Sequence, residues 1–181
     1  MSEWIETSTG NRISATAQLK RPDKIHIRGN STVDLEAVLH GDVELTDASD
    51  PAITIGKYCF VGPKTHIWPP KLTREEGAFG VSRIGSHVII GRNCKVSSAL
   101  IGNRVLIESN CTVGNLAIVY DCCVIKQGCT IPDKMVIPPF SLVSGAPGKD
   151  FAVKPLSNGY KRAIELESKE LQILGYYRNI N

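Results

Sequence analysis

Aliphatic residues recur at every sixth position over most of the chain. Counting back in steps of six from Val143, every residue reached down to Ile101 is Ile or Val. The same spacing continues after a one-residue deletion and in earlier segments: Val96, Ile90 and Ile84; Ile67, Val61 and Ile55; Leu45, Leu39, Val33 and Ile27. Neither the period of about 3.6 of an α-helix nor the period of about 2 of an ordinary strand fits so long a run. The repeat therefore predicts a solenoid, in which each repeat packs on its neighbours.

Two other positions of the hexapeptide support this interpretation. Glycine directly follows the aliphatic residue in several repeats: Gly56, Gly62, Gly85, Gly91, Gly102 and Gly114. The fifth position is small or compact in nearly every repeat: Ser31, Ala37, Val43, Cys59, Thr65, Val88, Cys94, Val105, Cys111, Ala117, Cys123, Cys129, Met135 and Ser141. Each hexapeptide thus predicts a short strand with an inward branched side chain, a turn, and a second inward position with little room. Three such strands would form a triangular coil, and stacked coils would pair their strands in parallel ~4.8 Å apart.

This pattern resembles the hexapeptide-repeat family of left-handed parallel β-helices. We therefore expect an all-β solenoid, a left-handed parallel β-helix, over residues 1–150. The left-handed sense is implied by the resemblance, because crossover connections between parallel strands are usually right-handed.

The residues after the repeats predict a C-terminal α-helix. Beyond Pro155 the hydrophobic period changes, and we expect a helix over about 157–175 within a tail of residues 151–181. Its apolar residues fall on one helical face: Tyr160, Ile164, Leu171 and Leu174. Gly175 is a typical residue for the end of a helix. The helix is expected to pack along the wall of the solenoid.

The largest interruption of the repeat is predicted to be a protruding loop over residues 68–83. It contains Trp68, Pro69, Pro70 and Phe79. Aromatic anchors beside proline suit a protein interface, so these four residues are the candidate partner-binding residues. The alternative is that the loop folds back and covers its own sheet.

Composition and charge restrict the class of partner. Aromatic residues make up only 6% of the chain, so the core must be filled by Ile, Val, Leu and Ala. The formal net charge of +3 favours neither nucleic acid nor an anionic membrane as the main partner. The sequence shows no secretory signal and no apolar stretch long enough to insert into a membrane. We therefore expect a cytoplasmic protein with reduced thiols.

The cysteines follow the repeat. Of the 6 cysteines, all but Cys122 occupy the small inward position, where they would stack as compact hydrophobic side chains. Cys122 is expected to point outward at a corner. Because no C-x-x-C pair occurs, a structural role is favoured over a zinc site.

Known hexapeptide β-helices include gamma-class carbonic anhydrases, acyltransferases and non-catalytic assembly subunits. The pairs Ile55-Gly56 and Ile84-Gly85 align the chain with the carbonic anhydrases. This alignment places Trp68, Arg92 and Ser97 at the three positions of the zinc ligands. None of the three is a suitable zinc ligand, and a guanidinium would repel the cation. We therefore expect no metal, no cofactor and no catalytic residue.

An acyltransferase would need a histidine as general base. The candidates are His26, His40, His66 and His87, and a solvated or structural role is the alternative for each. A catalytic hexapeptide protein, either gamma-carbonic-anhydrase-like or an acyltransferase, is thus the alternative to an assembly subunit.

A more specific resemblance extends from about Ile5 to Gly148. Several segments are similar to the dynactin subunit 5 family: Ile5-Glu6-Thr7, Gly10-Asn11, His40-Gly41-Asp42, Ile55-Gly56-Lys57-Tyr58-Cys59, Pro69-Pro70, Ile84-Gly85-Ser86-His87-Val88, Asp121-Cys122-Cys123, Pro138-Pro139-Phe140 and Ser144-Gly145-Ala146-Pro147-Gly148. The chain departs from this family at His40, where relatives tend to carry Arg, and the likeness fades in the C-terminal tail.

The resemblance implies a non-catalytic structural and adaptor subunit of the dynactin pointed-end complex. It implies a role in dynein-driven microtubule transport and in engaging cargo such as endosomes. The implied partners are dynactin subunit 6, dynactin subunit 4 and actin-related protein 11, with dynein adaptors or cargo as indirect partners. The implied location is the cytoplasm, in association with the cytoskeleton.

Overall fold

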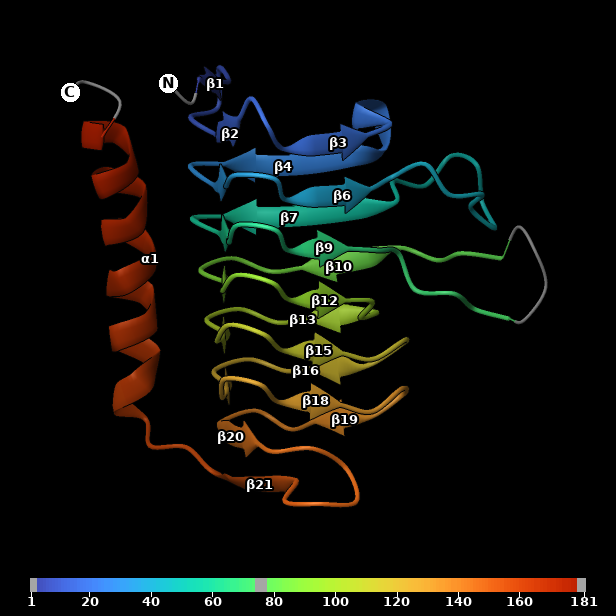
Figure 1. Cartoon of the computed structure of the whole chain (residues 1–181), viewed down its shortest axis with the longest axis vertical. Coiled ribbons are helices and arrows are strands. Elements are labelled where there is room, and N and C mark those ends of the chain that lie inside the picture. The colour runs from blue at the N-terminus through green and yellow to red at the C-terminus, as the bar shows by residue number, and fades with distance from the viewer. Residues whose placement is uncertain (1–2, 74–77, 179–181) are drawn as a thin grey trace.

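The six-residue repeat folds into a triangular prism whose three walls are sheets of mainly parallel strands (Figure 1). The computed structural model describes residues 3–73 and 78–178. Wall A contains β1 (Trp4–Glu6), β2 (Arg12–Ser14), β5 (Thr32–Val33), β8 (Phe60–Val61), β11 (Ile89–Ile90), β14 (Leu106–Ile107), β17 (Val124–Ile125), β20 (Ser141–Ser144) and β21 (Ala152–Pro155). Wall B contains β3 (Gln18–Lys20), β6 (Val38–His40), β9 (His66–Ile67), β12 (Lys95–Val96), β15 (Thr112–Val113) and β18 (Thr130–Ile131). Wall C contains β4 (Ile25–Gly29), β7 (Ile53–Lys57), β10 (Ser82–Ile84), β13 (Leu100–Ile101), β16 (Ile118–Val119) and β19 (Val136–Ile137).

The inward aliphatic residues form ladders in strict register. Ile90 pairs with Ile107 on wall A, Val96 with Val113 on wall B, and Ile84 with Ile101 on wall C. The main core cluster contains these residues and many of the compact residues at the fifth position, such as Cys59, Val88 and Ala117. The prediction of a left-handed parallel β-helix is therefore confirmed, and so is its C-terminal helix.

The glycines at the second position allow neighbouring coils to approach closely. A Cβ atom on Gly62 would lie 2.5 Å from the carbonyl carbon of Gly91 in the next coil. These repeat glycines do not adopt positive φ. Left-handed backbone occurs instead at corner residues such as Tyr58, His87 and Arg104, with φ of 56, 58 and 57°. Glycine is thus required here by coil packing and not by turn conformation.

Both ends of wall A are capped by antiparallel strands. β1 pairs with β2 at the N-terminal end, and β21 pairs with β20 at the C-terminal end. Walls B and C have no such cap among the described residues, so β3 and β4 are edge strands at one end, and β18 and β19 at the other. Edge strands expose backbone hydrogen-bonding groups that a further strand can use. A 3-10 helix, η1 (Pro22–Lys24), connects β3 to β4.

Helix α1 (Gly159–Arg178) runs back along the stack toward the N-terminal coils (Figure 1). The predicted end at Gly175 is wrong, because the helix continues to Arg178. The predicted apolar face is only partly correct. Ile164 is buried and Leu171 half-buried against wall A, but Tyr160 and Leu174 are exposed. No helix in the described residues is long and apolar enough to cross a membrane.

Polar residues of α1 account for the difference, because they contact successive coils. Glu165 pairs with Arg104, and Ser168 Oγ lies 2.8 Å from His87 Nδ1. Gln172 accepts a hydrogen bond from Thr32 at 2.9 Å and donates one to the Gly10 carbonyl at 2.9 Å. One helical turn rises about 5.4 Å and one coil about 4.8 Å. Each turn of α1 therefore reaches about one coil.

Candidate interaction surfaces

The two insertions of the solenoid lie side by side between walls B and C. One connects β6 to β7 and the other connects β9 to β10, and both project from the same side of the stack (Figure 1). Their backbones pair, since Thr46 N–H donates to the Phe79 carbonyl at 3.0 Å and Phe79 N–H donates to the Glu44 carbonyl at 3.2 Å. The insertions thus form one composite surface.

The base of the larger insertion is anchored to the prism. Leu72 N–H donates to the Ala78 carbonyl at 2.7 Å, and Gly80 N–H donates to the Pro70 carbonyl at 2.9 Å. The Asn115 side chain accepts from Lys71 N–H and donates to the Lys71 carbonyl, both at 2.8 Å. Residues 74–77 lie outside the described residues. The described part of this loop is therefore held in a defined position.

The four candidate partner-binding residues differ in their exposure. Pro69 and Pro70 are buried, whereas Trp68 and Phe79 are half-buried. The loop thus covers part of its own fold with the two prolines. Leu72, beside them, is 44% exposed. A partner at this surface would contact the rims of Trp68 and Phe79 together with Leu72.

Trp68 is packed in an aromatic stack on the outside of wall B. Its ring lies parallel to that of His40, with centroids 4.6 Å apart and an interplanar angle of 8°. His66 completes the stack, with its centroid 5.2 Å from that of Trp68. The Nε2 atom of His40 lies 3.0 Å from the Nδ1 atom of His66. The two imidazoles are therefore hydrogen-bonded to one another, each through one ring nitrogen.

Burial keeps both of these histidines neutral near neutral pH. Desolvation, followed by the charge of Lys20, lowers the pKa of His40 and of His66 below 6.5. The second histidine also lowers the pKa of His40, whereas Asp42, at 4.0 Å from His40 Nδ1, raises it. The charge of Lys95 lowers the pKa of His66 further, after burial and the charge of Lys20.

The sequence could in principle have shown this stack. His40 and Trp68 both directly follow an inward aliphatic residue, Leu39 and Ile67, and these two residues are in register on neighbouring strands. The insertion between β6 and β7 hides the relation, because it changes the spacing along the chain.

The three positions aligned with zinc ligands directly follow or lie close after strands of walls A and B. Trp68 belongs to the aromatic stack, Arg92 follows β11 at a corner, and Ser97 follows β12. Trp68 N–H donates to the Val96 carbonyl at 2.8 Å, which places it beside the strand that precedes Ser97. Within residues 3–73 and 78–178, no group of three or more His, Cys, Asp or Glu side chains is arranged to hold a metal ion.

The remaining histidines lie elsewhere. His87 stacks on Tyr58, with centroids 5.3 Å apart, and lies beneath Ser168 of α1. Burial lowers the pKa of His87. His26 is exposed on wall C. The candidate general bases are thus distributed over three parts of the prism, and only His40 and His66 are brought together.

The cysteines are all free and buried. Those at the inward position belong to the core cluster, and burial raises the pKa of Cys59 and Cys129 to about 11. Cys122 lies at a corner and outside the main core cluster, but it is only 4% exposed. Burial is the main reason why the pKa of the Cys122 thiol is raised, and the charge of Lys161 on α1 opposes this shift. Burial therefore favours the protonated form of the Cys59 and Cys129 thiols.

Comparison with solved structures identifies the same fold. A hexapeptide transferase family protein from Anaplasma phagocytophilum superposes with a TM-score of 0.64 at 17% sequence identity, over 91% of this chain and 90% of that chain. A point mutant of AntD, an N-acyltransferase from Bacillus cereus, superposes with a TM-score of 0.52 at 14% identity, over 90% of this chain and 88% of that chain. At these identities the likeness concerns the fold alone.

Comparison of the sequence identifies the family. The dynactin subunit 5 protein of Dictyostelium discoideum is 31% identical over 103 residues, which cover 56% of this chain and 48% of the relative. The chain thus spans about half the length of this curated relative. The family model described as dynactin subunit 5 matches residues 1–159. The chain belongs to the dynactin subunit 5 family.

Proposed function

We propose that the protein is a non-catalytic structural and adaptor subunit of the dynactin pointed-end complex. In this role it supports dynein-driven microtubule transport and the engagement of cargo such as endosomes, in the cytoplasm and in association with the cytoskeleton. The supporting observation is that, in a member of the dynactin subunit 5 family, the first zinc-ligand position is occupied by an indole stacked with two imidazoles. A gamma-class carbonic anhydrase would need a zinc ligand at this position, whereas Trp68 contributes aromatic packing.

The open ends of the prism suit end-to-end assembly. The edge strands β3 and β4 at one end, and β18 and β19 at the other, can extend their sheets onto another β-helix. Dynactin subunit 6 is the proposed partner at such an end. Dynactin subunit 4 and actin-related protein 11 are the proposed partners of the remaining surfaces.

The composite surface of the two insertions is the proposed contact for one of these partners. We expect Leu72→Ala combined with Phe79→Ala to reduce co-purification of the partner at least fivefold, because the side chain of Leu72 is exposed and that of Phe79 is half-buried where the two insertions meet. Trp68→Ala would test the rim of the aromatic stack separately. The measurement is assembly with subunits 6 and 4 and actin-related protein 11 after co-expression, followed by size-exclusion chromatography.

A matched control is Tyr120→Ala, since Tyr120 is an exposed aromatic residue that directly follows wall C. It should leave assembly unchanged. Thermal denaturation of each variant shows whether the prism is intact. Full assembly of the folded Leu72 and Phe79 variant would reject this surface as the contact.

The catalytic alternative predicts different behaviour in solution. A stable homotrimer with bound zinc, or with acyl transfer from a thioester donor, would support it. A chain that gains thermal stability when mixed with subunit 6 would support the assembly role, because binding of the native state raises the melting temperature.

A further inference from the structure

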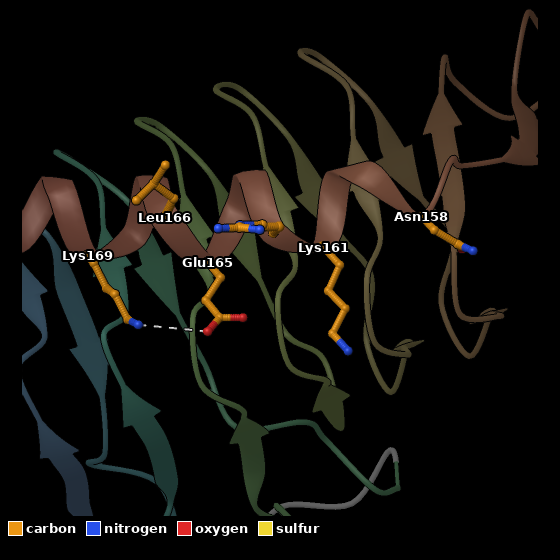
Figure 2. A pocket seen from close by; sticks show the side chains of 6 residues that line it. Asn158, Lys161, Glu165, Leu166 and Lys169 are labelled. Carbon is orange, nitrogen blue, oxygen red and sulfur yellow. Dashed lines mark ion pairs between the residues drawn. The ribbon is translucent and has the colours of Figure 1, made fainter.

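Helix α1 carries a positively charged groove that runs along the helix beside its polar contacts with the prism (Figure 2). The groove has a volume of about 530 Å³ and is lined by one stripe of residues: Asn158, Lys161, Arg162, Glu165, Leu166 and Lys169. Their spacing of three and four residues places them along a single face of the helix. This groove is distinct from the two insertions and from the ends of the prism.

The positive charge of the groove is not balanced by its one carboxylate. Glu165 already pairs with Arg104 at 3.0 Å and with Lys169 at 3.8 Å. Figure 2 shows the second of these ion pairs. The hydrogen bond from Arg104 is the main reason why the pKa of Glu165 is low. Lys161 and Arg162 have no ion-pair partner among the described residues. Two cations of the stripe are therefore free to pair with an anionic partner.

Apolar side chains accompany these cations. Leu166 is 57% exposed, and Ile173, one heptad later on the same side, is 54% exposed. Seven residues of helix correspond to about 10.5 Å, the length of one heptad repeat in a pair of packed helices. An exposed pair of large aliphatic residues at this spacing, beside unpaired cations, matches the face of an acidic amphipathic helix.

We propose that the groove binds an acidic amphipathic α-helix of a partner protein. Leucine-like residues of that helix pack on Leu166 and Ile173, and its carboxylates pair with Lys161 and Arg162. The charge pattern favours this occupant over a membrane or a nucleic acid. The exposed carboxylates of Glu167 and Glu170 interrupt the positive surface of α1, whereas a broad anionic surface needs a continuous basic patch.

The test uses the full-length chain and synthetic peptides. One fluorescent helical peptide carries leucines seven residues apart flanked by glutamates, and a second has the same composition in scrambled order. The first should bind with measurable anisotropy change, and the second at least tenfold more weakly. Vesicles containing phosphatidylserine should not bind in a flotation assay.

Matched charge reversals locate the site. Lys161→Glu with Arg162→Glu should weaken peptide binding at least tenfold, and Leu166→Ala with Ile173→Ala at least fivefold. Lys95→Glu with Lys134→Glu changes the net charge equally on exposed residues away from α1 and should have no effect. All four residues changed on α1 are exposed, so the folded state is expected to persist, and circular dichroism verifies it.

Three results would overturn the proposal. They are equal binding of the scrambled peptide, equal loss of binding in the control charge reversal, and preferential binding of the vesicles. The α1 variants leave the insertions and the prism ends unchanged. If they lose peptide binding but still assemble into the pointed-end complex, the groove and the assembly surfaces act independently.

Discussion

At the scale of single residues, the position within the hexapeptide decides which side chains enter the core. Ile107 and Ile125 are inward and fully buried, whereas Val136, one residue before the inward position of its repeat, is 52% exposed. This alternation could be predicted from the sequence because it depends on spacing alone. The stack of His40 and Trp68 could be predicted only by aligning two coils across the insertion between β6 and β7, which breaks the spacing along the chain.

Replacement of an inward residue should be costly. Ile107→Ala removes a buried side chain between Ile90 and Ile125, its partners in register. We expect it to lower the free energy of unfolding by about 2–5 kcal/mol, since the close-packed core cannot collapse around the cavity. Val136→Ala, at an exposed position, should change it by less than about 1 kcal/mol. Denaturant titration measures both, and equal losses would contradict the assigned ladder.

The histidines predict the direction of a pH dependence. Burial holds the pKa of His40, His66 and His87 below the value of 6.5 that the unfolded chain retains. Below pH 6.5 the unfolded state therefore binds more protons than the folded state. The free energy of unfolding is thus unaffected by these histidines above pH 6.5 and decreases as the pH falls toward their folded pKa values. The melting temperature should therefore fall between about pH 7 and about pH 5.

Glutamine at positions 40 and 66 should make that fall smaller, because the folded and unfolded states then differ by fewer titrating groups. His26→Gln, on an exposed strand position, is the control and should leave the pH profile unchanged. An identical profile for the double variant would show that these histidines are not the source.

At the scale of secondary-structure elements, close contact between coils determines where glycine is needed. A Cβ on Gly62 would meet the backbone of Gly91 and Arg92, whereas the atoms nearest to a Cβ on Gly80 belong to the flexible Leu72 side chain. Gly62→Ala should therefore lower stability by about 1–3 kcal/mol through strain, and Gly80→Ala by much less. Thermal denaturation compares the two, and equal effects would argue against coil spacing as the reason for the repeat glycines.

Helix α1 shows where prediction from periodicity reaches its limit. Its existence could be predicted because the hydrophobic period changes after the repeats. Its buried face could not, because Ser168 and Gln172 bind His87, Thr32 and the Gly10 carbonyl of separate coils. Such contacts depend on how turns of a helix match the coils of the prism, and this match is not encoded in either segment alone.

At the scale of the whole molecule, the three walls have different surroundings. Wall A is capped at both ends and covered by α1, whereas walls B and C end in edge strands and are separated by the two insertions. The fold could be predicted from the repeat, and its hand only from the resemblance to known β-helices. The pairing of the insertions required the structure, because their sequences carry no repeat.

The composition of the native complex tests the central account most directly. The tagged full-length chain is isolated from cells under mild conditions, and the mass and subunit content of the complex are measured. The account predicts one copy of the chain in a large assembly that contains dynactin subunits 4 and 6 and actin-related protein 11. A homotrimer free of these proteins, with bound zinc or acyltransferase activity, would contradict it.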